Sequence, residues 1–206
     1  MKKYYFLLLP LLAIYSCIHS LYPISKLESD YIFREEILGD WLGEKKISCS
    51  VDSAGNKKYL ISVFDDLGLP GGDSGKIDSS YFEAFLIQRS GQYYLDCSPA
   101  TEGPYGLEES LARVGLYEQT ALLPLHKIYK VDIVSKDRLI ICGINKDSLE
   151  KYSATSGLTI RKDLMGQHSI ILTDQPGKLQ KDLLQSKKAK FIFSDSLVLT
   201  RKSLHK

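Results

Sequence analysis

The chain has 206 residues, of which 44% are hydrophobic and 25% charged, a composition typical of one globular domain with an apolar core. Its formal net charge of +2 is supplied by Lys2 and Lys3, so the rest of the chain is balanced. This balance argues against a nucleic-acid-binding protein and against a cation-storage protein. The 13 tyrosines favour β structure, because Tyr suits pleated, half-buried surfaces.

The N-terminus has the pattern of an export signal. Lys2 and Lys3 precede an apolar run over residues 4–15, which is shorter than the roughly 20 residues of a membrane-spanning helix. The run therefore predicts a signal peptide. It ends at Ser16 and Cys17, which resembles the bacterial lipoprotein signal, where a small residue precedes the cysteine that becomes the lipid-modified N-terminus.

The resemblance implies a signal peptide over 1–16 and a lipid on Cys17, with membrane attachment through that lipid. Ordinary signal cleavage elsewhere is the alternative. We expect residues 17–30 to be a lipidated tether and 31–206 to be the folded domain. Because Ile18 stands where an Asp would signal retention in the inner membrane of enterobacteria, the resemblance favours the outer membrane of the cell envelope and leaves its face open.

Three cysteines are left once Cys17 is assigned to lipid: Cys49, Cys97 and Cys142. An odd number cannot all pair within the chain. Each lies in an apolar, strand-like stretch, which favours buried free thiols, although one disulfide is permitted in the envelope. No Cys-x-x-Cys pair is present, which argues against a cysteine zinc site or a thioredoxin-like centre.

The remaining elements follow one another as short apolar runs separated by turn residues. A short helix is predicted over 31–39, because its apolar residues have helical spacing and Gly39 follows. Eight β-like runs come next, over 40–51, 58–65, 81–89, 92–97, 122–135, 138–144, 167–173 and 196–201. Short connecting helices are predicted after Asn145 or Asp147, over 175–186, and near 107–114.

Eight short strands joined largely by hairpins predict an all-β fold, either an antiparallel barrel or a sandwich. Ser90-Gly91 and Lys136-Asp137 supply two of the tight turns. The few helices lie in connections, which argues against a parallel α/β sheet. A closed eight-stranded barrel is either filled by side chains or holds one small ligand.

Gly39-Asp40-Trp41 at the start of the first run resembles the Gly-x-Trp motif of lipocalins and related calycin barrels. In those families the Trp closes the floor of the barrel, and a basic residue at the end of the last strand lies across it. Arg201 ends the last run here. The resemblance therefore implies a barrel-closing pair of Trp41 and Arg201, in which a cation–π contact would contribute about 0.5–2 kcal/mol.

More broadly, the chain resembles a family of lipocalin-like bacterial lipoproteins over most of residues 37–202. The matching pieces are 38–41, 93–96, 123–131 and 171–174, in that order. The resemblance implies an antiparallel eight-stranded lipocalin-like barrel with one or two short helices in its connections. It implies no particular activity.

Candidate chemistry is sparse. Gly72 to Gly75 copies a serine-protease tetrapeptide, but no positioned His accompanies it, and the segment is better interpreted as a loop. His126 and His168 have no metal-ligand spacing. No catalytic residue, metal or cofactor is predicted.

Tyr93, His126, Tyr129 and Val131 are the candidate lining of a ligand cavity. His126 in particular either faces the barrel mouth, or is hydrogen-bonded to backbone or exposed. The sequence thus predicts a lipid-anchored envelope protein that binds a small, largely apolar ligand without catalysis. The alternative is a structural or protein-interaction lipoprotein with a filled barrel, docking on other envelope proteins.

Overall fold

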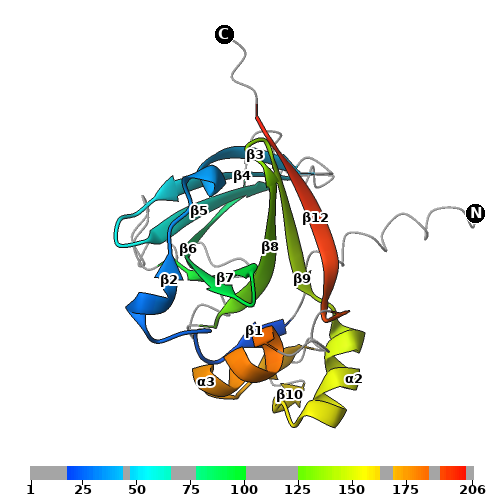
Figure 1. The fold of residues 1–206 in the computed structure, drawn as a ribbon. Helices are drawn as coiled ribbons and strands as arrows, with labels where there is room; N and C mark the ends of the chain where they lie inside the picture. Colours follow the sequence, from blue (N-terminus) through cyan, green and yellow to red (C-terminus); the bar gives the residue numbers. More distant parts are fainter. Residues whose placement is uncertain are drawn as a thin grey trace, which may run out of the picture.

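A computed structural model describes residues 18–43, 47–65, 78–100, 125–162, 169–185 and 191–202. Within these ranges the protein is mostly β, and eight strands close into the antiparallel barrel that the sequence predicts (Figure 1). The barrel strands are β3 (Gly39–Gly43), β4 (Ile47–Ser53), β5 (Lys58–Asp65), β6 (Asp78–Arg89), β7 (Gln92–Pro99), β8 (Lys127–Ser135), β9 (Arg138–Ile144) and β12 (Phe193–Arg201).

Neighbouring barrel strands follow the order of the chain from β3 to β9. The strand β12 then pairs with both β9 and β3, and this completes the circle. Ser90 and Gly91 between β6 and β7 have φ angles of 52° and 76°, the left-handed conformation that a tight hairpin turn with the twist of its strands requires. The predicted hairpins at 90–91 and 136–137 are both present.

The other described elements lie outside the barrel wall. A small sheet consists of β1 (Ile18–Ser20), β11 (Ile170–Leu172) and β10 (Ile160–Lys162), and β2 (Tyr31–Ile32) extends the edge of β6. The helices are α2 (Lys146–Ser156) and α3 (Pro176–Leu179), which continues as a π-helical turn over Gln180–Gln185. Single 3-10 turns cover Glu28–Asp30 and Glu35–Ile37.

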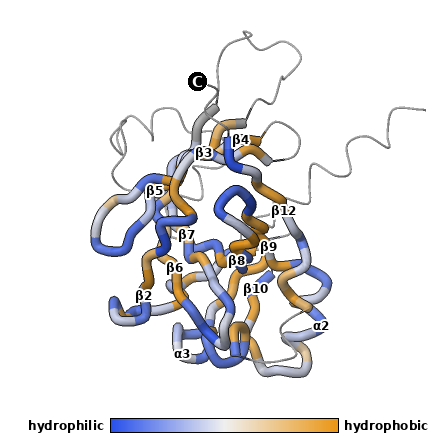
Figure 2. Tube along the Cα trace, turned by 45° about the horizontal axis from the view of Figure 1, so that its top comes forward, coloured by the Kyte–Doolittle hydropathy of each residue, from blue (hydrophilic) through white to orange (hydrophobic). Residues whose placement is uncertain are grey.

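Two apolar cores share the barrel wall, because successive strand residues point to opposite faces. One core fills part of the barrel interior and includes Trp41, Tyr59 and Val131. The other lies between the outer faces of β7, β8 and β9 and the helices, where Ile128 and Leu149 are buried. Strands covered on both faces need nearly continuous apolar sequence, and β9 carries the hydrophobic colour over much of its length in Figure 2.

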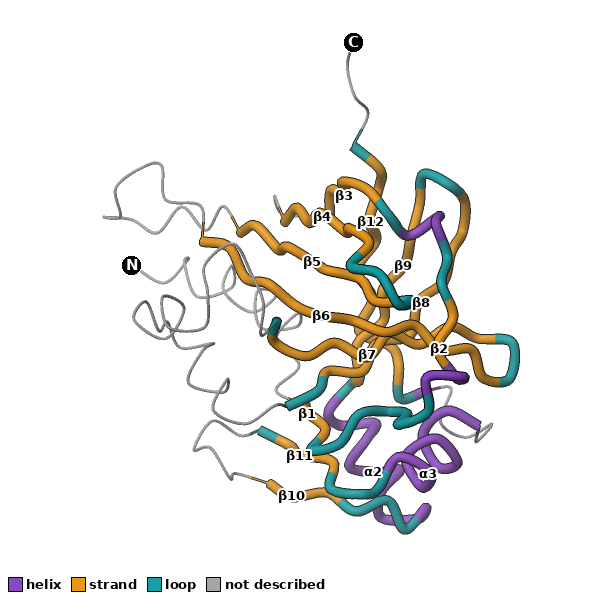
Figure 3. The backbone as a smooth tube through the Cα atoms, turned by 90° about the vertical axis from the view of Figure 1, so that its left-hand side faces the viewer, coloured by secondary structure: helices purple, strands orange, loops and turns teal. Residues whose placement is uncertain are grey.

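The barrel has two distinguishable ends. The closed end is defined by the turns at 54–57, 90–91 and 136–137 together with the start of β3 and the end of β12. The far end is where the strands border residues 44–46, 66–77 and 101–124. Figure 3 shows β5 and β6 running between the two ends, with α2, α3 and the small sheet along one side.

The eight barrel strands are not the eight predicted runs. The run expected over 40–51 is two strands, β3 and β4, and the run expected over 167–173 forms β11 of the small sheet. The helix expected over 31–39 is wrong as well: the segment forms β2 and a single 3-10 turn. Its apolar residues pack on the closed end of the barrel, where Phe33 stacks on Tyr59 at 5.0 Å between ring centroids.

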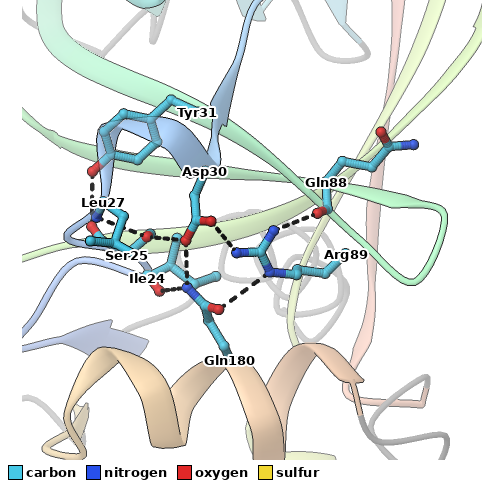
Figure 4. A network of polar contacts seen from close by, with 8 residues as sticks. All are labelled: Ile24, Ser25, Leu27, Asp30, Tyr31, Gln88, Arg89 and Gln180. Atoms are coloured by element: carbon cyan, nitrogen blue, oxygen red, sulfur yellow. Dashed lines mark hydrogen bonds and ion pairs between the residues drawn. The ribbon is translucent and has the colours of Figure 1, made fainter.

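Residues 18–30 are part of the folded domain, so the tether expected over 17–30 is wrong for its described portion. Ile24 is fully buried, and its carbonyl accepts a hydrogen bond from Gln180 Nε2 at 2.9 Å. Asp30 forms an ion pair of 2.6 Å with Arg89 and accepts a hydrogen bond from the Ser25 hydroxyl (Figure 4). Long-range partners therefore fix a segment whose own sequence has no regular period. Cys17 itself lies outside the described residues.

Candidate binding site in the barrel

Three of the four predicted cavity residues project into the barrel interior. Tyr93 lies opposite Val131 on the neighbouring strand, and Tyr129 lies opposite Leu95. Val131 and Leu95 are buried in the interior core, and Tyr93 and Tyr129 pack against it. The alternation of strand residues predicted this shared face for Tyr129 and Val131.

His126 lies on the outer face of the wall, so its assignment to the ligand cavity is wrong. Its Nδ1 is 2.7 Å from Asp96 Oδ1, and the side chain of Asp96 is only 3% exposed. The other oxygen of Asp96 accepts a hydrogen bond from the backbone N–H of Ile24 at 2.6 Å. His126 is an odd number of residues from Tyr129, and in a strand this places it on the opposite face. The pair therefore fastens residues 18–25 to the barrel.

The structure brings Trp41 and Arg201 together at the closed end. Trp41 is fully buried and donates its indole N–H to the Ile37 carbonyl at 2.8 Å. The guanidinium carbon of Arg201 lies 4.4 Å from the centre of the indole ring. The same guanidinium donates to the carbonyls of Leu38 at 2.7 Å, Glu36 at 3.0 Å and Lys136 at 2.7 Å. The Arg201 side chain thus joins β12 to residues 36–38 and to the 136–137 turn across the floor.

Tyr93 belongs to this closed end rather than to a cavity. Arg34 donates from its guanidinium to the Tyr93 hydroxyl at 2.7 Å and lies over the ring at 5.4 Å. The backbone N–H of Arg34 donates to the hydroxyl of Tyr59 at 2.7 Å, and burial raises the pKa of Tyr59. Because of these hydrogen bonds, both tyrosines are part of the floor.

The interior changes character toward the far end. Around the floor, Val51, Leu95, Val131, Leu139 and Leu199 are all at most 6% exposed. On β4, β5, β8 and β9 the next interior side chains, which we call the upper layer, are only half-buried: Cys49, Ile61, Tyr129 and Ile141. On β7 the corresponding side chain, Cys97, is 6% exposed.

The upper layer combines enclosure with accessible surface. Burial raises the pKa of Cys49 to about 11 and raises that of Tyr129 well above its ordinary range, so protein atoms surround both groups. Both residues nevertheless keep part of their surface accessible to water. A Cβ placed at Gly143 would make ordinary van der Waals contacts with Asp195 at 3.6 Å and with the Tyr129 ring at 4.0 Å, so the wall is closely packed at this glycine. These side chains lie on the interior face and are still partly accessible, which makes the upper layer the candidate binding site.

The chemistry of the upper layer suits binding better than catalysis. Its side chains are apolar apart from the Tyr129 hydroxyl and the Cys49 thiol. Cys49, Cys97 and Cys142 are free thiols, and burial raises the pKa of each, which keeps them protonated at neutral pH. Among the described residues, no group of three His, Cys, Asp or Glu side chains could hold a metal ion. His168 and the 72–75 tetrapeptide lie outside the described ranges.

Comparisons of the chain with protein-family models, with curated proteins and with solved structures find no match. Within the described ranges, none of the helices is long and apolar enough to cross a membrane.

Proposed function

We propose that the protein is a lipid-anchored protein of the cell envelope, on the outer membrane, that holds a small, largely apolar ligand inside its barrel and catalyses no reaction. The observation that carries the proposal is the upper layer of half-buried interior side chains above a buried floor. The apolar run before Ser16 and Cys17 supports the lipid anchor.

The upper layer suits an apolar ligand on energetic grounds. Removing apolar surface from water contributes about 25 cal/mol per Å², and here the ligand and the walls would both lose contact with water. The Tyr129 hydroxyl supplies one polar group that could orient the ligand, as in binding sites with few convergent polar groups.

The test is native mass spectrometry of the lipoprotein purified from its native envelope, followed by extraction and identification of any bound molecule. A stoichiometric apolar compound is the expected result. The protein must begin no later than Ile18, because residues 18–30 are part of the fold.

A matched pair of variants locates the site. Ile61→Trp adds an indole to the upper layer and is expected to weaken the binding of an apolar fluorescent probe at least tenfold, which corresponds to about 1.4 kcal/mol. Leu42→Trp adds the same group at an outward-facing position that is 41% exposed, and it should leave binding unchanged. An empty protein that also binds no lipid or dye from a panel would refute the binding proposal.

The alternative function is a structural or interaction role with a filled barrel. Contiguous exposed apolar patches are a feature of contact sites, and the most exposed large apolar side chains among the described residues are Phe191 at 78% and Leu27 at 63%. Crosslinking in the intact envelope, compared between the natural protein and Phe191→Ser, tests this role.

A further inference from the structure

The first described residues of the chain are fixed beside the start of β8. Ser20 exchanges two backbone hydrogen bonds with His126, of 2.7 and 2.9 Å. Ile18 is 5% exposed and pairs in register with Ile170 of β11. Residues 18–20 are therefore a strand of the domain, with partners on two sides.

This attachment leaves the proposed lipid site very little freedom. Cys17 and Ser20 are three residues apart, so their Cα atoms are separated by at most about 11 Å. A free tether over 17–30 would instead allow about 45 Å. Ser20 is hydrogen-bonded to His126, the residue before β8, so this reach limits the proposed lipid attachment to about 11 Å from that point.

The start of β8 lies at the far end of the barrel. The strand begins at Lys127, next to the 101–124 connection, and nine residues later ends at Ser135, beside the turn whose Lys136 carbonyl binds Arg201. Nine strand residues span about 30 Å. The lipid site is therefore beside the end with the half-buried upper layer, and the floor is a strand length away.

We propose that the far end of the barrel lies on the bilayer that holds the lipid of Cys17, and that the ligand is an acyl-chain lipid exchanged with this bilayer. The inference rests on the proposed anchor and binding function. It specifies a partner, the lipid bilayer, and an orientation in which the floor closed by Trp41 and Arg201 points away from the membrane.

Charge near the anchor agrees with this orientation. Arg161 and Lys162 are exposed at the end of β10, and Lys162 is in register with Ile170, the residue that pairs with Ile18. Lys162 also forms an ion pair of 3.0 Å with Glu150 at the surface. Cations held close to a lipid anchor strengthen attachment to anionic headgroups.

The test uses the full lipidated protein in vesicles that contain a photoactivatable phospholipid. Intact mass first establishes lipidation. After illumination, peptide mapping is expected to find lipid adducts at 125–127 and 161–162 and to find few at the closed-end turns 54–57 and 90–91. Adducts concentrated on the closed-end turns, or spread evenly over both ends, would overturn the orientation.

A linker variant provides the control for tethering. A flexible Gly/Ser insertion of about 20 residues between Cys17 and Ile18 has a root-mean-square length of about 25 Å, and it should bring the ratio of far-end to closed-end adducts close to one. The same insertion after Lys202 should leave the ratio unchanged. If the preference survives the linker at Cys17, the short anchor does not set the orientation and the inference is wrong.

The two proposals fail in different ways. A chain without lipid on Cys17 overturns both. A lipidated protein that binds apolar probes but contacts the bilayer through its closed end overturns the orientation alone. A lipidated protein with far-end adducts that binds no apolar probe overturns the ligand-binding function and the lipid ligand.

Discussion

Replacing Arg201 tests how the barrel floor is held together. Arg201→Met keeps an unbranched stem of similar length and removes the guanidinium with its three hydrogen bonds to backbone carbonyls. It also removes the cation–π contact with Trp41. The side chain is 30% exposed, so each hydrogen bond should contribute nearer to 0.5–1 kcal/mol than to the upper range. With about 1 kcal/mol for the cation–π contact, the free energy of unfolding should fall by about 2.5–4 kcal/mol.

The measurement is urea unfolding followed by far-ultraviolet circular dichroism, because the fluorescence of Trp41 would itself change. Arg201→Lys should also lose much of this stability, since one ammonium group cannot reproduce a planar fork that reaches three carbonyls. Arg138→Met changes an exposed arginine on the neighbouring strand β9 and should stay within about 0.5 kcal/mol of the natural protein. A loss below about 0.5 kcal/mol for Arg201→Met would refute this account of the floor.

Three further predictions concern other parts of the fold. Gly39→Ala should destabilise the protein by about 1–3 kcal/mol, because φ is 117° there and the new Cβ would collide with the Arg201 guanidinium. Thermal unfolding measures this loss of stability, and an unchanged melting temperature would contradict the prediction. Burial and a nearby ammonium group lower the pKa of His19 to about 4. As the pH is lowered from 6.5 to about 4, the unfolded chain therefore takes up a proton that the folded chain does not. The free energy of unfolding should decrease by up to about 3 kcal/mol as the pH is lowered across this window. His19→Gln should remove that component, and parallel pH profiles for the two proteins would disprove it. Asp96→Ala should cost about 1–3 kcal/mol and speed amide hydrogen exchange over residues 18–25, whereas unchanged exchange there would show that the carboxylate does not hold this segment.

Local pattern was enough to locate most barrel strands and their hairpins. Alternation of apolar and polar residues marks a strand with one face buried, and turn residues such as Ser90 and Gly91 join neighbouring strands at short range. The same alternation gave Tyr129 and Val131 a common face. The same alternation places His126, three residues before Tyr129, on the opposite face. The Gly39 to Trp41 motif and Arg201 named two residues that meet across the floor, although they are far apart in sequence.

The tertiary structure decided which sheet each strand joins and where the folded domain begins. The apolar run at 170–172 could have completed the barrel, but it pairs with Ile18–Ser20 and Ile160–Lys162 instead. The segment 18–30 has the sequence of a tether, and it is ordered by Asp96, Arg89 and Gln180. Sequence period reports which face of an element is apolar, because that depends on neighbours a few residues away. The partner that covers the face is set by contacts between distant parts of the chain. The favourable free energy of these contacts must exceed the entropic cost of closing the intervening loops, and it does so only when the complete fold has formed.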